Sequence, residues 1–218
     1  MNLIERLGNW YNVFDKDEFS YLLNQLRVLY KTESVMPASN VIFKAFEQCP
    51  FDKCKVIMLF QDPYPQKNVA TGIALANSAN TPISSLSPSL KKFMETVPEV
   101  DQNFDITLES WCNQGVLMLN SALTVVENKI NSHALLWRLF ISTFLMNYSD
   151  YNRDCVYVLF GKQAQNFKQY IKHSSIIMET WHPSYLVRNK EPMPDVLSMI
   201  NNTLVSTNRT PINWNVRK

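Results

Sequence analysis

The sequence lacks a long uninterrupted apolar run and contains few glycines. Nowhere do about 18 apolar residues follow one another, the length that a membrane-spanning helix requires. An acidic residue, Glu5, stands where a signal peptide would carry basic residues followed by an apolar core. We therefore expect a soluble intracellular protein, located in the cytoplasm, or in the nucleus or a viral factory if the source is eukaryotic or viral.

The chain also lacks a strong excess of charge of either sign. Lysine and arginine total 21 against 19 for aspartate and glutamate, which gives a net charge of +2. Such a balance neither demands nor excludes a polyanionic partner. Any affinity for DNA must come from a local arrangement of residues.

Clustered cysteines are absent as well. The four cysteines are scattered along the chain at Cys49, Cys54, Cys112 and Cys155. A zinc or iron–sulfur site needs tighter clustering of Cys and His than one C-x4-C pair followed by two distant thiols. We expect reduced thiols in the core and no metal site.

Four short apolar runs, rich in β-branched or aromatic residues, predict buried strands. They are Lys55–Phe60, Val116–Leu119, Cys155–Phe160 and Ser175–Glu179. The length of 218 residues suits one domain, and neither a linker, a repeat nor a low-complexity tract suggests a second.

Helix-like stretches lie between these strands. Ser87-Pro88 opens one of them with an N-cap and a first-turn proline. The others are predicted near Glu18–Tyr30, Val41–Gln48, Leu135–Met146, Gly161–Ile171 and Val196–Val205. Alternating strands and helices predict an α/β fold with a parallel sheet that is covered on both faces.

Polar or turn-forming residues follow every predicted strand. They are Gln61-Asp62-Pro63-Tyr64, Asn120-Ser121, Gly161-Lys162 and, slightly later, His182-Pro183-Ser184. In parallel sheets the ligand binds beyond the carboxyl ends of the strands. Each residue alone has an ordinary explanation as a turn former, cap or loop residue. A carboxylate, an amide and an imidazole at three strand ends together suggest an acid–base site.

Eight segments carry a resemblance to a known family. In chain order they are QDPYP, GIALAN, SPSL, LESWCNQGVLMLNSALTV, NSHALLW, VLFGKQAQ, HPSYL and PINW. With this order and spacing, the chain from about Trp10 to Trp214 resembles the main uracil-excising family of uracil-DNA glycosylases, family 1. The resemblance implies one uracil-DNA glycosylase-like domain over residues 1–218, a central four-stranded parallel β-sheet flanked by α-helices, and no cofactor. It also implies a monomeric DNA repair hydrolase that releases uracil from single- or double-stranded DNA.

The same resemblance implies roles in the base pocket. Asp62 matches the residue that orients the attacking water and stabilises positive charge on the sugar, and His182 matches the donor to uracil O2. Gln61 matches a backbone contact to the base, Tyr64 the wall at the C5 position and Asn120 the amide that reads the uracil edge.

Further matches concern the DNA strand. Ser89, Ser184 and the Gly161-Lys162 turn match phosphate-binding loops, and Leu186 matches the wedge that fills the space left by the flipped base. The resemblance also makes a DNA-mimicking protein inhibitor a candidate partner.

Several residues depart from the family pattern. Pro65 replaces a histidine, Lys162 replaces a serine that contacts phosphate, and Tyr185 replaces a proline in the wedge loop. Leu75 stands where the family has a phenylalanine that stacks on uracil, and such a stack is worth about 1–3 kcal/mol. This leaves an alternative open: a catalytically weak DNA-binding or replication-accessory protein with the same fold. An enzyme acting on another damaged base is a third hypothesis.

Other conspicuous residues have structural explanations. His133 is expected to begin a helix, and His173 is expected to face solvent after one. The indole rings at Trp10, Trp111, Trp137 and Trp214 are expected to pack in the core.

Overall fold

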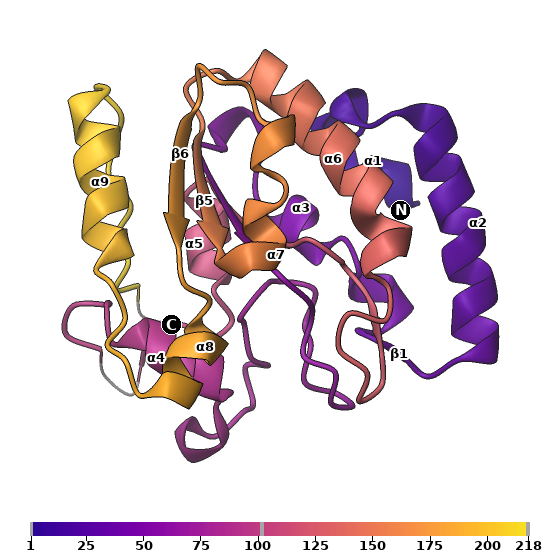
Figure 1. Cartoon of the computed structure of the whole chain (residues 1–218), viewed down its shortest axis with the longest axis horizontal. Coiled ribbons are helices and arrows are strands. Elements are labelled where there is room, and N and C mark those ends of the chain that lie inside the picture. The colour runs from indigo at the N-terminus through magenta and orange to yellow at the C-terminus, as the bar shows by residue number, and fades with distance from the viewer. Residues whose placement is uncertain (1, 101–102, 217–218) are drawn as a thin grey trace.

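The computed structural model describes residues 2–100 and 103–216, and its centre is a four-stranded parallel sheet with strand order β3-β2-β5-β6 (Figure 1). The strands are β2 (Val56–Phe60), β3 (Val116–Asn120), β5 (Val156–Phe160) and β6 (Ile176–Thr180). All four predicted strands are present, each to within one residue at either end. The predicted burial of the last one is wrong, because β6 is an edge strand whose residues are half-buried or exposed. Strands β2, β3 and β5 are buried at every position, because helices cover both faces of the sheet.

The register aligns the carboxyl ends of the strands. Phe60 pairs with Asn120 across β2 and β3, and Phe160 pairs with Thr180 across β5 and β6. The residues that follow these positions therefore emerge along one edge of the sheet. In Figure 1 this edge faces the end of the molecule where α4 (Pro88–Met94) and α8 (Pro183–Asn189) lie, and these two helices pack against each other.

Longer helices flank the sheet. They are α2 (Lys16–Thr32), α6 (Ala134–Tyr151) and α9 (Val196–Ser206). All three were predicted, with slightly shorter bounds. In Figure 1, α2 and α6 lie to one side of the sheet, whereas α9 lies beyond the edge strand β6.

Two predicted helices are shorter than expected. The Val41–Gln48 stretch contains a 3-10 turn (Ser39–Val41) and only a short helix, α3 (Lys44–Gln48). The Gly161–Ile171 stretch divides into α7 (Gly161–Gln165) and a 3-10 turn (Lys168–Tyr170), because Asn166 ends α7 and Phe167 turns into the core.

Some short elements had no counterpart in the prediction. They are α1 (Leu3–Leu7), α5 (Glu109–Asn113), α8, the 3-10 turns Gly8–Val13, Phe51–Lys53 and Ile83–Ser85, and an antiparallel pair of β1 (Val35–Met36) with β4 (Val125–Val126). Ser87 is the N-cap residue of α4, as predicted. Its side chain accepts a hydrogen bond from Asn77 instead of capping the helix.

The core contains the aromatic side chains that the sequence predicts to be buried. Trp10, Trp111, Trp137 and Trp214 are at most 5% exposed. All four cysteines are buried and free, as expected for core thiols. Within the described ranges, no helix combines the length and the apolar character needed to cross a bilayer.

Candidate active site

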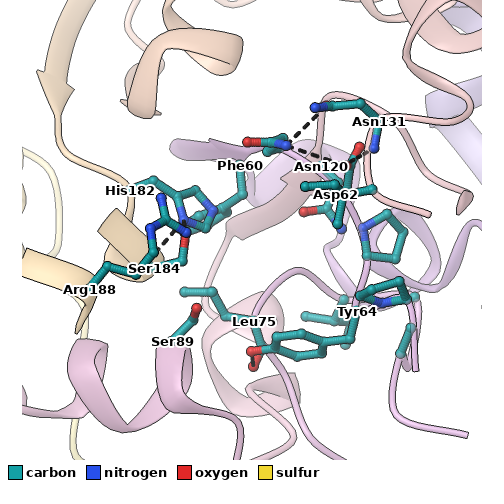
Figure 2. Close-up of a pocket in the computed structure, with 17 residues that line it drawn as sticks. Phe60, Asp62, Tyr64, Leu75, Ser89, Asn120, Asn131, His182, Ser184 and Arg188 are labelled. Carbon is teal, nitrogen blue, oxygen red and sulfur yellow. Dashed lines mark hydrogen bonds between the residues drawn. The ribbon is translucent and has the colours of Figure 1, made fainter. Parts of the chain in front are cut away.

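A cavity of about 420 Å³ lies at the carboxyl edge of the sheet. Its walls come from segments far apart in the sequence: the residues after β2, the end of β3, the residues after β6, and the helices α4 and α8. In Figure 2, His182, Ser184 and Arg188 lie on one side of the cavity, Asp62, Asn120 and Asn131 lie on the other, and Leu75 and Tyr64 lie below. The structure thus brings together all six residues that the sequence predicts for catalysis and base binding.

Asp62 is held by its neighbours at the cavity wall. Its Oδ2 accepts hydrogen bonds from the backbone N–H of Asn131 at 2.7 Å and from Nε2 of Gln61 at 3.3 Å. The Gln61 amide also donates to Oδ1 of Asn131 at 2.9 Å, which closes a three-residue network. Burial raises the pKa of the Asp62 carboxyl above its ordinary value, although these donors oppose the rise. A carboxylate with a raised pKa is a better acceptor of a proton from water.

His182 faces the cavity from the N-cap position of α8. Its Nδ1 accepts a hydrogen bond from the backbone N–H of Ser184 at 3.2 Å, and the Ser184 hydroxyl lies 2.8 Å from the same nitrogen. A backbone N–H can only donate, so Nδ1 is the acceptor and the neutral ring carries its proton on Nε2. Burial, aided by the guanidinium of Arg188, lowers the pKa of His182 to about 4. At neutral pH the site therefore presents an uncharged Nε2–H donor.

Asn120 offers an amide without a protein partner. It is the last residue of β3 and is 8% exposed, yet its side chain makes no hydrogen bond to any residue the structure describes. Its amide atoms are not fully buried and can be reached from the cavity. This donor and acceptor pair at the cavity wall is available for a ligand.

Tyr64 and Leu75 line one wall of the cavity and are joined by a hydrogen bond. The Tyr64 hydroxyl donates to the backbone carbonyl of Leu75 at 2.9 Å, which fixes the ring. Burial raises the pKa of Tyr64 to about 12, so the hydroxyl stays protonated and can donate. Leu75 is 6% exposed and has a left-handed backbone, with φ at 63°. Its aliphatic side chain lines the cavity where the resemblance implies an aromatic ring.

Gly161 packs closely against His182. Its φ is +80°, and a Cβ built on it would lie 2.9 Å from the Cβ of His182. No other residue type fits this close approach without displacing the histidine. The predicted phosphate-loop glycine thus also positions a residue of the cavity.

The predicted DNA-binding residues fall into three groups. Ser89 and Ser184 line the cavity. Lys162 is exposed on α7 outside it, and Tyr185 is half-buried against the Trp181 ring. Leu186 is 1% exposed and belongs to the core, so its side chain is not at the surface where a wedge would lie. A wedge role for Leu186 requires α8 to move.

Two residues of the site were not predicted. Arg188 lies one helical turn after Ser184 on α8, a spacing that could have placed it beside the cavity once the helix was known. Asn131 comes from the loop before α6 and meets Asp62 from 69 positions away, so no local pattern indicates the contact.

The two histidines outside the site behave as predicted. His133 is the N-cap residue of α6, and its Nδ1 lies 2.9 Å from the Thr124 hydroxyl. His173 is exposed in the turn before β6. Among the described residues, no cluster of three or more His, Cys, Asp or Glu side chains could hold a metal ion.

Comparison with known proteins identifies the family. The model of the uracil DNA glycosylase superfamily matches residues 46–205. A protein of Campylobacter fetus subsp. fetus named uracil-DNA glycosylase is 34% identical over 95% of this chain and 92% of its own length. One from Campylobacter lari is 32% identical over 93% of this chain and 92% of its own length.

Solved structures of similar proteins have the same fold as this chain. A mimivirus UNG variant in complex with UGI is 26% identical, has a TM-score of 0.84, and is matched over 99% of this chain and 92% of that chain. The Nitratifractor salsuginis UNG shares the fold, with a TM-score of 0.62 at 18% identity over the full length of both chains. The sequence, the sheet and the position of the cavity lead to one conclusion: this chain belongs to the uracil DNA glycosylase superfamily.

Proposed function

We propose that this protein is a uracil-DNA glycosylase that flips deoxyuridine out of DNA and hydrolyses its N-glycosidic bond, leaving an abasic site. The observation that carries the proposal is the opposition of Asp62 and His182 across a cavity whose wall also holds the unpartnered amide of Asn120. A volume of about 420 Å³ lies within the range of small-ligand sites and is sufficient for a nucleobase.

Opposite charges develop at the two ends of the breaking bond. The sugar becomes oxocarbenium-like, and the leaving uracil takes up the bonding electron pair as an anion. Asp62 stabilises the sugar cation and accepts a proton from the attacking water. The Nε2–H of His182 donates to uracil O2, where the negative charge accumulates. Groups fixed in advance by Asn131, Gln61 and Ser184 need little reorganisation during the reaction.

The same cavity can select the base. Uracil presents a donor at N3 and an acceptor at O4, and one amide at Asn120 satisfies both. Cytosine reverses both groups, which leaves buried polar atoms unpaired at about 1–3 kcal/mol each. The fixed ring of Tyr64 excludes the methyl group of thymine. The carbonyl of Gln61 accepts from Ser121 and Ala122, and this fixes the peptide that would contact the base.

Hydroxyl and backbone groups would hold the DNA strand. Ser89 and Ser184 line the cavity, and the Gly161-Lys162 turn lies at the same edge of the sheet. Such contacts position the phosphates without reading sequence, which is consistent with a net charge of only +2. A protein inhibitor is also a candidate partner for this surface, since a similar mimivirus UNG variant was solved in complex with UGI.

Leu75 supports a second candidate function. An aliphatic side chain provides a smaller contact to a flat base than the aromatic ring that the family resemblance implies. A DNA-binding or replication-accessory protein with weak catalysis would tolerate this change.

A substrate panel separates the two functions. Oligonucleotides carrying one uracil, cytosine or thymine are incubated with the protein, and alkaline cleavage reveals abasic sites. We expect cleavage at uracil only, in single- and double-stranded DNA. A protein that binds these oligonucleotides and produces no abasic site at uracil would support the accessory function, and abasic sites at another base alone would indicate a different specificity.

A further inference from the structure

A second hollow, of about 490 Å³, lies beside the edge strand β6. It is bounded by α7, by the end of β6 and by the start of α9, and its walls include Lys162, Met178, Trp181 and Met199. Of the residues that line it, Lys162 has been assigned above as a phosphate contact, and Trp181 has no assigned role. In Figure 1, the two elements β6 and α9 that bound it are neighbours, and α8 lies below them.

Trp181 is the unusual residue of this hollow. It is 47% exposed, whereas the other four tryptophans are at most 5% exposed. Its ring stacks on the ring of Tyr185, with centroids 4.6 Å apart and planes at 14°. This stack holds a large flat surface in a fixed orientation at the protein surface. Flat aromatic surfaces of this kind bind nucleobases through their π-faces, regardless of sequence.

The charges near Trp181 also suit a nucleotide. Lys162 is exposed and forms no ion pair with any residue in the described part of the chain. The one carboxylate in the hollow, Glu179, is paired with Lys168 at 2.5 Å. The hollow therefore combines a free cation for a phosphate with an aromatic face for a base, and its negative charge is neutralised.

The hollow and the cavity are lined by two residues that are adjacent in the chain. His182 lines the cavity and Trp181 lines the hollow. The backbone of His182 is extended, with φ at −70° and ψ at 136°, and the two neighbouring side chains enter different sites. Residues 181–182 thus belong to the walls of both sites. A nucleotide next to a uridine in the cavity is therefore expected to lie close to Trp181.

We propose that Trp181, supported by Tyr185, is the stacking surface for the unpaired nucleobase adjacent to the flipped uridine, and that Lys162 contacts the phosphate of that nucleotide. This second base site rests on the proposed function and makes single-stranded DNA a favoured substrate. It also supplies an aromatic contact next to the flipped nucleotide, a position that the buried Leu186 does not reach in this structure.

The kinetic test changes the protein and the DNA together. Single-stranded oligonucleotides carry one uracil, flanked on both sides by thymines or by abasic tetrahydrofuran residues, and kcat/KM is measured for wild type, Trp181→Ala and Trp181→Phe. We expect Trp181→Ala to lower kcat/KM about fivefold or more with the thymine-flanked substrate. With the abasic-flanked substrate, kcat/KM should be almost unchanged. Trp181→Phe, which keeps a ring, should retain most of the activity. Tyr21→Ala serves as the control, because Tyr21 is 67% exposed on α2, away from this edge.

Fluorescence provides an independent measurement, because Trp181 is the exposed tryptophan. A uracil-free single-stranded oligonucleotide should quench part of the wild-type emission, and the quenching should disappear in Trp181→Phe. The proposal would be overturned if Trp181→Ala lowered kcat/KM equally with the thymine-flanked and the abasic-flanked substrate. An absence of DNA-dependent quenching in wild type would also overturn it. If wild type releases no uracil at all, the proposed function fails, and the quenching experiment alone then decides whether a base stacks on Trp181.

Discussion

The backbone N–H of Ser184 donates to Nδ1 of His182 at 3.2 Å and thereby assigns the proton of the neutral ring to Nε2. The ring also packs edge-to-face on Phe60, with centroids 6.0 Å apart. Its hydrogen bond and its packing both orient Nε2 toward the cavity. The donor is thus in place before any substrate binds.

This environment predicts how His182 titrates. Burial and the nearby Arg188 lower the pKa of His182 to about 4. NMR of the ring C–H resonances, assigned with a His182→Gln variant, should show a midpoint well below the ordinary value of 6.5. Arg188→Gln should raise that midpoint. A wild-type midpoint near 6.5 would contradict the neutral donor.

The same shift has a consequence for stability. The unfolded chain takes up a proton on this residue at a higher pH than the folded chain does. The contribution of His182 to the free energy of unfolding is therefore present above pH 6.5 and is lost as the pH falls toward about 4.

Gly161 is predicted to be required for the position of His182. An alanine at this site would bring its Cβ to within 2.9 Å of the His182 Cβ, and the histidine must shift to relieve the clash. We expect Gly161→Ala to lower the rate of uracil release about tenfold or more, because small displacements of catalytic groups are costly.

Gly8→Ala provides the matched control. Gly8 also has a positive φ, at +53°, but a Cβ there would meet nothing within 4 Å. Both variants thus suffer backbone strain and only one disturbs the site. Equal activities of the two variants would show that the contact with His182 is unimportant.

Substitution should distinguish the roles of Tyr64 and Asn120 in selecting the base. Tyr64→Ala opens the wall at the thymine methyl group and should allow release of thymine. Asn120→Asp reverses part of the hydrogen-bonding pattern and should allow release of cytosine. Both variants are compared with wild type on oligonucleotides carrying a single uracil, thymine or cytosine. If folded variants remove uracil and gain neither activity, the assignment of these walls is wrong.

Leu75 is predicted to limit the activity. Leu75→Phe should restore a flat stacking surface and raise kcat/KM about tenfold, which corresponds to about 1.4 kcal/mol. Binding to uracil-free DNA should change little, since phosphate contacts dominate that affinity. The position is buried and has a φ of 63°, so the larger ring could instead overpack at about 1–3 kcal/mol. A thermal melt measured alongside the kinetics identifies that case. A stable variant without a gain would show that Leu75 does not limit uracil capture.

Much of the fold could be predicted because three of the four strands of the sheet are buried at every position. Such strands are short continuous apolar runs, and the polar residues that follow them, Asp62 and His182 among them, must gather at one edge of a parallel sheet. The short helix α8 was missed, since seven residues are too few for a helical period to emerge. Its absence from the prediction also hid the burial of Leu186 and the approach of Arg188 to the cavity.

Two contacts within the site could not be predicted. Asn131 reaches Asp62 from the loop before α6, and the clearance that requires Gly161 depends on where His182 lies in space. Both are consequences of packing rather than of any local pattern.

The most direct measurement is single-turnover release of free uracil from a uracil-containing oligonucleotide by wild type, Asp62→Asn and His182→Leu, with DNA affinity measured on the same preparations. Both side chains are proposed to act mainly in the transition state, so each substitution should reduce the rate at least tenfold while folding and DNA binding persist. Near-wild-type release by either folded variant would contradict the proposed roles of Asp62 and His182. DNA binding by wild type without any release of uracil would contradict the proposed activity itself.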